Sequence, residues 1–438
     1  MTGASRDDII HVMNNFYSPH EFIYRPRWIT APFRTALAAH PIVVLTGARQ
    51  VGKSTLLQHA EPVCHWRYRT LDDFDVLRQA TQNPDALWAG TDRIVLDEVQ
   101  RAPALFSAVK QAVDQAHGAF RVVLSGSANL LLMRRVSESL AGRAVYLVLA
   151  PMTLGEMWGT PPPRILDHLR AGVWPADGRV SHALPDLFTL ALRGFLPALL
   201  SLEQPEDWTR WWEGYVATYL ERDLRELSQI PSLVDFHRCM ELLALRNGQI
   251  LNQSEVARDA GIPQPTVHRY LTLLETTYLV ERLPAYTPSR TTRLIKAPKL
   301  YWADTGLVAF LAGYYDRESL AQAREAGAYF ETVILHHLKV LSQLLVPRGR
   351  LYYWRTRRGE EVDFILEQGR QVWAFECKMT TTARYGDAEG LRHFLQAVPQ
   401  ARGGILLYHG SEISRLDDRI IALPWILLAT GGKVDTQQ

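Results

Sequence analysis

The sequence predicts a multi-domain α/β protein that begins with a parallel sheet and ends with a second, smaller set of strands. A glycine-rich loop near residue 50 joins an apolar run to a helix-forming run. Further apolar runs alternate with helix-forming segments up to about residue 150, which is typical of a parallel sheet with helical crossovers. Three strand-like runs follow after residue 350. A chain of 438 residues is longer than the domains that usually form around one hydrophobic core, so we expect two to four domains.

The glycine-rich loop is the first element with a chemical meaning. Residues 47–54 follow the pattern G-x-x-x-x-G-K-[ST] directly after the apolar run 42–46. Backbone N–H groups of such a loop hold phosphates, while Lys53 would reach the β- and γ-phosphates and Ser54 would bind magnesium. We therefore expect ATP and Mg²⁺ as cofactors. The predicted nucleotide-binding residues are Gly47, Ala48, Arg49, Gln50, Val51, Gly52, Lys53, Ser54 and Thr55.

A second strand, residues 93–97, ends at two carboxylates. Asp97 is expected to hold the magnesium ion together with Ser54. Glu98 points differently and is expected to orient and deprotonate the attacking water. The alternative is a strand that ends in a solvated acidic turn.

Three further apolar runs, 65–71, 120–125 and 144–149, complete five predicted strands. Ser125 ends one of them and is expected to sense the γ-phosphate, with Asn129 as the competing candidate. Arg134, Arg135 and Arg143 precede the last strand, and each is a candidate arginine finger for a neighbouring subunit. Surface solvation explains each arginine equally well. The predicted catalytic set is Lys53, Asp97, Glu98, Ser125 and Arg143.

Taken together, these motifs resemble a family of bacterial and archaeal predicted ATPases of the AAA-plus type. The resemblance rests on residues 46–54, 96–100, 125–128, 139–143 and 151–156. It implies a sheet in which the strand ending at Ser125 separates the phosphate-loop strand from the strand ending at Asp97. It also implies a homo-oligomer, for which a hexamer is favoured. We place this ATPase domain at residues 1–155.

A helical, tryptophan-rich connector is predicted over residues 156–230. Trp208, Trp211 and Trp212 are interpreted as core residues. Arg222 and Asp223 lie in a run that also resembles the family. Arg222 is a candidate nucleotide sensor, and a buried Arg–Asp ion pair is the alternative.

A winged-helix domain is predicted over residues 231–310. Helices are expected at 232–246, 251–261 and 262–274, and the last two form a helix-turn-helix pattern followed by a strand-like run at 278–284. No acidic residue separates Glu281 from Asp304, and such a basic stretch suits DNA phosphate contacts. The predicted DNA-binding residues are Thr266, His268, Arg269, Arg282, Arg290, Arg293, Lys296 and Lys299. The alternative is a winged helix that binds protein or packs internally.

The last predicted domain, residues 311–438, carries a second set of carboxylates. Glu331 lies in a helix, and the strand-like runs 352–354, 361–366 and 371–378 follow it. Asp363, Glu376 and Lys378 recreate the pattern of the PD-(D/E)xK nuclease fold, with an expected αβββαβ order completed by a helix near 390–395 and a strand at 404–408. In that chemistry carboxylates hold magnesium and the lysine positions the nucleophile.

Glu376 and Lys378 are two residues apart on a strand, so both project to the same face. The expected metal ligands are Glu331, Asp363 and Glu376. The family resemblance extends to this region, because its members carry a C-terminal domain of unknown function (4143) with a similar glutamate, an E-V-D-F run and an E-x-K strand. A degenerate nuclease fold that only binds DNA, and a carboxylate cluster kept for stability, are the alternatives.

Composition excludes several other classes. The formal charge of +2 gives no whole-molecule attraction to polyanions. Cys64, Cys239 and Cys377 form no C-x-x-C pair, which argues against zinc and disulfides. The leucine-rich run 184–202 is interrupted by polar residues and proline, so a buried helix and turn are expected rather than a membrane span. The polar, acidic N-terminus is unlike a signal peptide, and a cytoplasmic location is expected.

Two functions of different classes fit these patterns. The first is a magnesium-dependent ATPase coupled to DNA binding or remodelling, as a motor or an ATP-gated nuclease. The second is a nucleotide-dependent signalling switch whose winged helix holds protein partners and whose nuclease-like domain is inert. Salt-dependent DNA binding separates them, because phosphate contacts release counterions.

Overall fold

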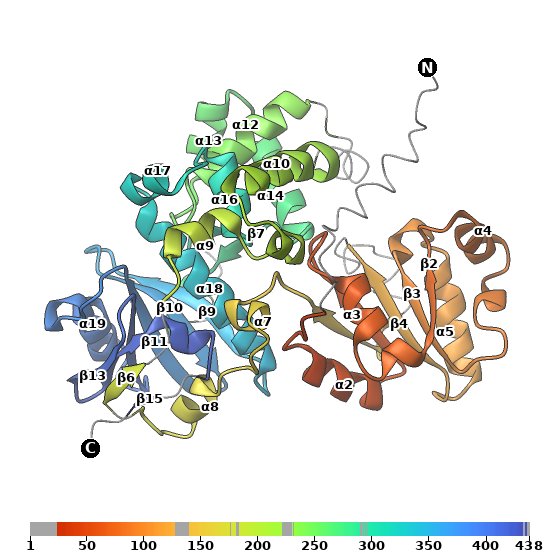
Figure 1. Cartoon of the computed structure of the whole chain (residues 1–438), viewed down its shortest axis with the longest axis horizontal. Helices are drawn as coiled ribbons and strands as arrows, with labels where there is room; N and C mark the ends of the chain where they lie inside the picture. Colours follow the sequence, from red (N-terminus) through yellow and green to blue (C-terminus); the bar gives the residue numbers. More distant parts are fainter. Residues whose placement is uncertain are drawn as a thin grey trace.

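A computed structural model describes residues 24–127, 140–175, 177–180, 184–220, 230, 232–289, 291, 293, 296–431 and 434–435. Two sheets occupy opposite ends of the molecule in Figure 1, the N-terminal sheet at the right and the C-terminal sheet at the lower left. A group of helices lies above the C-terminal sheet in this view and approaches the N-terminal sheet from one side.

The N-terminal sheet is a five-stranded parallel sheet with the order β2-β3-β4-β1-β5. β4 therefore separates β1 from β3, which confirms the expected topology. β2 is shorter than predicted because His65 belongs to a 3₁₀ turn. The elements are α2 (Thr30–Ala39), β1 (Ile42–Thr46), α3 (Lys53–His59), β2 (Arg67–Thr70), α4 (Phe74–Gln82), β3 (Arg93–Asp97), α5 (Leu105–Gln115), β4 (Arg121–Gly126) and β5 (Ala144–Val148).

The segment expected to form one helical connector is divided between two parts of the molecule. Its elements are α7 (Leu154–Met157), α8 (Ile165–Arg170), β6 (Gly178–Val180), α9 (Leu187–Arg193), η5 (Pro197–Ser201), α10 (Pro205–Tyr215) and the π-helix η6 (Val216–Leu220). β6 pairs with a strand of the C-terminal sheet, and α8 contributes to the same core. α10 instead packs among the central helices, and Trp208 and Trp212 are buried there as expected.

The central part has the three predicted helices and a strand within the predicted run 278–284, and a second strand that was not predicted pairs with it. These elements are α12 (Leu233–Ala244), α13 (Gln253–Ala260), α14 (Gln264–Thr276), β7 (Val280–Leu283) and β8 (Lys299–Trp302). Asn252 caps α13 by accepting from Ser254 and Glu255 N–H groups, and Gly261 ends the helix in a left-handed conformation. β7 and β8 are antiparallel. Two short helices, α16 (Thr305–Leu311) and α17 (Arg317–Gln322), lead onward.

The C-terminal part contains the expected αβββαβ order, extended by further strands. Its elements are α18 (Ala326–Leu344), β9 (Arg350–Arg355), β10 (Glu361–Gln368), β11 (Gln371–Lys378), α19 (Glu389–Ala397), β12 (Gly403–Tyr408), β13 (Glu412–Asp417), β14 (Ile420–Pro424) and β15 (Val434–Asp435). The mixed sheet has the order β15-β6-β13-β14-β12-β11-β10-β9. α18 covers one face and α19 covers the other.

One continuous hydrophobic core joins the N-terminal sheet to the central helices. Val43 and Leu45 of β1 belong to the same cluster as Trp212 of α10 and Phe236 of α12. Alternate residues of β1, such as Val44, pack on the other face against α5. Within the described ranges, no helix combines the length and apolar character required to cross a membrane.

Candidate functional site

The phosphate loop has the backbone conformation that its two glycines allow. Gly47 has φ +149°, and a Cβ at this position would lie 2.2 Å from the carbonyl oxygen of Leu149. Gly52 has φ +91° and begins α3 in the left-handed region. Substitution of either glycine would therefore strain the loop or displace it from β5.

Lys53 is buried at the start of α3. Its ammonium donates to the carbonyl oxygens of Gly47, at 3.1 Å, and of Ala48, at 2.8 Å. Burial lowers the pKa of Lys53 to about 8, although Glu98 and Asp97 act in the opposite direction. The ammonium is therefore held by neutral oxygens of the loop that a phosphate could replace.

Ser54 and Asp97 meet as magnesium binding requires. The Ser54 hydroxyl donates to Asp97 Oδ2 at 2.6 Å, and the Glu98 N–H donates to Asp97 Oδ1 at 3.0 Å. A hydroxyl and a carboxylate are hard oxygen ligands, so this pair fits Mg²⁺. Tyr68 also donates to Asp97 Oδ2, at 2.6 Å. Tyr68 was absent from the predicted site, although its place on β2, next to β3, could have suggested it.

Glu98 and Ser125 lie at the carboxyl ends of adjacent strands. Glu98 has φ +54°, is half-buried, and accepts from the side chain of Gln100. Burial raises its pKa, and Lys53 opposes that shift. The Ser125 hydroxyl is buried without a hydrogen-bond partner in the described part of the chain. Of the remaining predicted loop residues, Arg49, Gln50 and Thr55 are half-buried.

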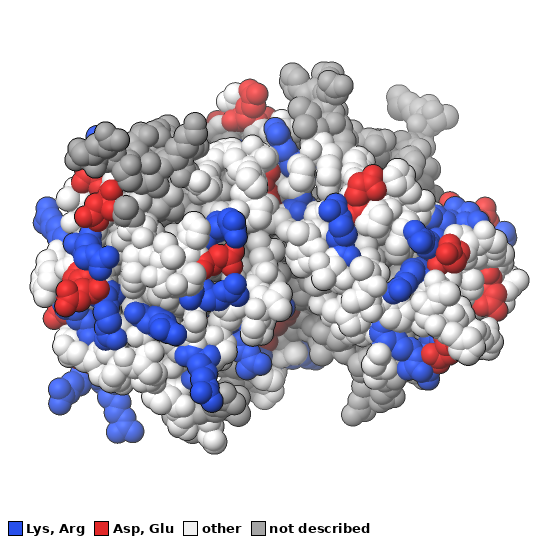
Figure 2. Space-filling model, turned by 90° about the horizontal axis from the view of Figure 1, so that it is seen from below, with Lys and Arg blue, Asp and Glu red and all other residues white. Residues whose placement is uncertain are grey.

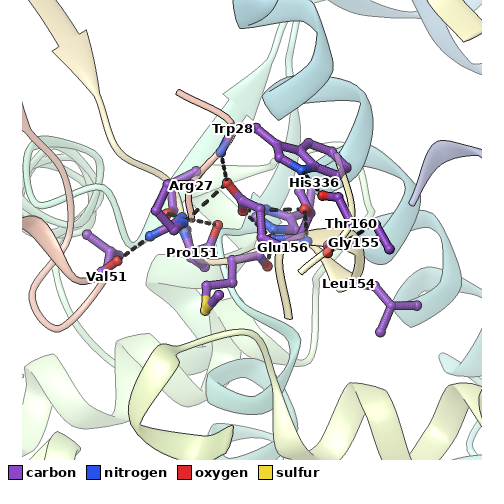
Figure 3. Close-up of polar contacts among 12 residues, drawn as sticks. Arg27, Trp28, Val51, Pro151, Leu154, Gly155, Glu156, Thr160 and His336 are labelled. Atoms are coloured by element: carbon purple, nitrogen blue, oxygen red, sulfur yellow. Dashed lines mark hydrogen bonds and ion pairs between the residues drawn. The ribbon is translucent and has the colours of Figure 1, made fainter. Parts of the chain in front are cut away.

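A buried arginine that the sequence reasoning missed ties the loop to the rest of the chain. Arg27 donates to the carbonyl oxygen of Val51 at 2.6 Å and forms an ion pair with Glu156 at 3.2 Å. Figure 3 shows both contacts, together with the donation from the Trp28 N–H to Glu156. His336, on α18, is hydrogen-bonded to the Met152 carbonyl oxygen at 2.9 Å. The motif 151–156 therefore connects the phosphate loop to α18.

A second contact joins the loop strand to the central helices. The side chain of Tyr278, which follows α14, packs against the hydrophobic core that holds Val43 and Leu45 of β1. Tyr278 has a left-handed φ of +61°. Gly47, the first residue of the phosphate loop, directly follows β1, so a shift of α14 would displace the start of the loop.

The predicted DNA-binding residues divide into two groups. His268 and Arg269 are exposed on α14, and Thr266 is partly exposed. Lys296 is exposed and donates to the Arg355 carbonyl oxygen at 3.4 Å. Arg290 lies outside the described residues. On the face in Figure 2, basic and acidic side chains are interspersed.

Three other predicted DNA-binding residues, Arg282, Arg293 and Lys299, form ion pairs with carboxylates. Arg282 forms a two-point ion pair with Glu275. Arg293 forms one with Glu367, at 2.7 and 3.0 Å, between two tyrosine rings. These pairs leave neither guanidinium free for a phosphate.

For Lys299 the expected surface contact with DNA is wrong. Its side chain is buried, and its ammonium lies among carboxylates of the C-terminal part. The basic run was read as one exposed face, whereas strand alternation turns Lys299 inward.

The C-terminal carboxylates converge as predicted from α18, β10 and β11. Lys378 donates to Glu376 Oε1 at 3.0 Å, and the Cys377 N–H donates to Asp363 Oδ2 at 2.8 Å. Glu331 Oε2 accepts from the Tyr301 hydroxyl at 2.8 Å. The sequence therefore located this cluster, and the structure adds Lys299, Glu361 and Tyr301 to it.

Burial and the neighbouring charges together shift the pKa values of this cluster. Burial, followed by the charge of Asp363, raises the pKa of Glu331 to about 7 and of Glu376 to about 8. Burial alone would lower the pKa of Lys299, but Glu331, Asp363 and Glu361 outweigh burial and raise it. Glu376 Oε2 is buried without a hydrogen-bond partner among the described residues.

Comparisons with known proteins follow the same division of the chain. The model of the AAA domain matches residues 39–158, and two domains of unknown function, DUF8612 and DUF4143, match 184–318 and 326–428. Uncharacterized proteins of Mycobacterium tuberculosis and Mycobacterium bovis are each 32% identical over 409 residues, which cover 92% of this chain and 85% of the relative. The chain belongs to the family of AAA-type ATPases that carry a C-terminal DUF4143 domain.

Among solved structures, the chain is similar to the Walker-type ATPase of Pyrococcus abyssi, with 14% identity and a TM-score of 0.43. That match covers 66% of this chain and 99% of the other.

In this AAA-type ATPase, Arg143 lies far from its own phosphate loop. It precedes β5, and its carbonyl oxygen accepts from the N–H of Ile42 at the amino end of β1, whereas the loop follows the carboxyl end. Its side chain forms an ion pair with Asp114 of α5 at 2.6 Å. The other proposed sensors and fingers, Asn129, Arg134, Arg135, Arg222 and Asp223, lie outside the described residues.

Proposed function

We propose that this AAA-type ATPase hydrolyses ATP with magnesium and that its central helices bind DNA, so that hydrolysis changes how DNA is held. The observation that carries the proposal is the meeting of Lys53, Ser54, Asp97 and Glu98 around one phosphate loop.

The residues of the loop have distinct roles in this proposal. Lys53 exchanges its loop carbonyls for phosphate oxygens, where an ammonium stabilises developing negative charge. Ser54 and Asp97 would hold a magnesium ion, which would supply charge neutralisation at the phosphates. Glu98 orients the attacking water and accepts its proton, because its raised pKa makes it a better base than an exposed glutamate. Ser125 offers its unpaired hydroxyl to the γ-phosphate or that water.

DNA binding is assigned to α13, α14 and the β7–β8 pair, read as a winged helix. Exposed His268 and Arg269 and half-exposed Thr266 are placed to contact DNA along α14. The packing of Tyr278 against the core that holds Val43 and Leu45 of β1 supports coupling between this surface and the phosphate loop. Arg143 is proposed as the arginine finger of a neighbouring subunit in a homo-oligomer, with a hexamer favoured, because it lies away from its own nucleotide site. Its guanidinium would have to exchange Asp114 for the neighbour's phosphate.

The test is ATP hydrolysis measured with single-stranded, duplex and branched DNA. Stimulation by one form supports the proposal and names the preferred DNA. Hydrolysis that no DNA form changes, together with no DNA binding at low salt, contradicts the DNA assignment and leaves the ATPase alone. Full hydrolysis by a strictly monomeric protein contradicts the role of Arg143.

The contact residues are tested by the salt dependence of DNA affinity. Arg269→Ala is expected to reduce the slope of log affinity against log salt by about 1, since one phosphate contact is lost. Arg78→Ala, an exposed arginine on α4, is the matched control and leaves the slope unchanged. DNA affinity without salt dependence would instead favour the alternative, a nucleotide-dependent switch that holds protein partners.

A second candidate function is metal-dependent DNA cleavage by the C-terminal domain, read as a PD-(D/E)xK nuclease-like fold. The convergence of Glu331, Asp363, Glu376 and Lys378 favours it. The carboxylates suit magnesium, but the ammonium of Lys299 lies within 4 Å of Glu331 and Asp363, so a magnesium ion fits only where Lys299 has been displaced. If wild-type protein cleaves any DNA form, Glu376→Ala and Lys378→Ala should eliminate the cleavage. Intact DNA with ATP and magnesium contradicts this candidate.

A further inference from the structure

β8 divides its side chains between two cores. Leu300 and Trp302 pack with the central helices and the N-terminal domain. Lys299 and Tyr301 project to the opposite face of the strand and reach the C-terminal carboxylates. The strand that completes the proposed winged helix therefore delivers two polar side chains into another domain.

Lys299 makes more carboxylate contacts than any other described cation of the cluster. Its ammonium lies 3.7 Å from Glu331 Oε2 and 3.9 Å from Asp363 Oδ1, and it forms an ion pair with Glu361. Only 4% of the residue is exposed. By contrast, Lys378 is paired with Glu376 alone, and 40% of its side chain is exposed.

This ammonium is positioned where a divalent cation would have to bind. Magnesium coordinates carboxylate oxygens at about 2.0–2.1 Å, so an ion shared by Glu331 and Asp363 would lie close to the Lys299 nitrogen. A metal ion and an ammonium group so close to each other in a buried site repel each other strongly. The two therefore compete for the same oxygens.

We infer that Lys299 is the resident cation of the C-terminal cluster, supplied by β8, and that it keeps divalent metal ions out of the cluster. The inference rests on the second candidate function in one assumption only, that the carboxylate cluster binds a cation. It requires neither ATP hydrolysis nor DNA cleavage. The unpaired oxygen of Glu376 is the acceptor that gains a ligand when a metal ion replaces Lys299.

The experiment measures Mn²⁺ binding to the full chain without nucleotide, with Asp97→Asn present throughout to remove the phosphate-loop metal site. Lys299→Met removes the charge and keeps a long apolar stem. It is expected to bind one Mn²⁺ at least about tenfold more tightly than the parent, and adding Glu376→Gln should abolish that gain. Lys299→Arg keeps the charge and should bind as weakly as the parent.

Lys339→Met is the matched control, because Lys339 pairs with Glu281 outside the cluster. It should leave Mn²⁺ affinity unchanged. Equal Mn²⁺ affinity in the parent and in Lys299→Met overturns the inference.

A second readout covers the case in which Lys299→Met fails to fold without metal. Mn²⁺ should then raise the melting temperature of Lys299→Met and leave that of the parent unchanged. An equal shift in both, or no shift in either, also overturns the inference. Loss of ATP hydrolysis in Lys53→Ala tests the proposed ATPase separately and has no bearing on this result.

Discussion

The two sites of this molecule each contain a buried lysine, but the lysines have opposite surroundings. Lys53 is held by two backbone carbonyl oxygens, and its pKa is lowered. Lys299 is held by three carboxylates, and its pKa is raised. A lysine whose hydrogen bonds go to neutral oxygens can exchange them for those of an incoming anion, whereas a lysine paired directly with carboxylates is part of the protein's own charge balance. Residue type and burial alone do not separate a ligand-binding lysine from a structural one.

The largest expected effect tests whether the first site performs chemistry. Glu98→Gln should preserve ATP binding and lower turnover by about 10²–10⁴-fold, because the amide cannot accept the proton of the attacking water. Steady-state hydrolysis and nucleotide affinity measured on the same protein check this. Glu376→Gln, in the other site, should leave turnover unchanged. Normal turnover in Glu98→Gln would remove this residue from the mechanism.

The next effect compares the two lysines directly. Lys53→Ala should weaken ATP binding by at least about 100-fold, or on the order of 3 kcal/mol, since charge-assisted contacts to phosphate are lost. Lys299→Met should leave ATP affinity unchanged. Equilibrium binding of a fluorescent ATP analogue measures both. An equal loss in the two variants would show that both lysines act through overall stability.

The lowered pKa of Lys53 makes nucleotide binding depend on pH. The charged ammonium is the form that binds phosphate, and above pH 8 the folded protein loses its proton. The ATP dissociation constant should therefore rise with pH above about 8, approaching tenfold per unit. Lys53→Arg should flatten the dependence, because arginine stays charged. A flat profile for the wild type would contradict the lowered pKa.

The smallest effect concerns two tyrosines that donate to carboxylates, Tyr68 to Asp97 and Tyr301 to Glu331. Tyr68→Phe should raise the magnesium concentration needed for half-maximal hydrolysis roughly fivefold, because Asp97 loses a positioning partner. This corresponds to a loss of about 1 kcal/mol in the free energy of magnesium binding. Tyr301→Phe should leave that concentration unchanged. Instead it should destabilise the fold by about 1–3 kcal/mol, since Glu331 is buried, and thermal unfolding measures the loss. The reverse pattern would contradict the assignment of the two sites.

The phosphate-loop site was predictable in most of its parts because its signals are local. The glycine spacing, the lysine and the two carboxylates at a strand end all appear within short windows of sequence. Tyr68 and Arg27 were missed because nothing local marks them. Tyr68 acts through the neighbouring strand, and Arg27 contacts a loop 24 residues away.

The C-terminal cluster was predicted at four of its residues, Glu331, Asp363, Glu376 and Lys378, whereas Lys299, Glu361 and Tyr301 were missed. The αβββαβ order was also predicted, whereas β6 and β13–β15 were not. The pairings of β6 with β13 and β15 join segments that are far apart in the sequence. The error at Lys299 has the same origin. The sequence analysis predicted no strand at 299–302, and which core each face of that strand meets is decided by tertiary packing.

The alternation of β8 also restricts how Lys299 can leave the cluster. Side chains on a strand repeat every two residues, so sliding β8 by one residue would put Leu300 among the carboxylates and Lys299 among apolar side chains. A gradual shift along the strand axis is thus closed to the molecule. Lys299 can therefore leave the cluster only if its own side chain rotates or if the whole strand pair detaches. The strand consequently holds Lys299 either fully in the cluster or fully out of it.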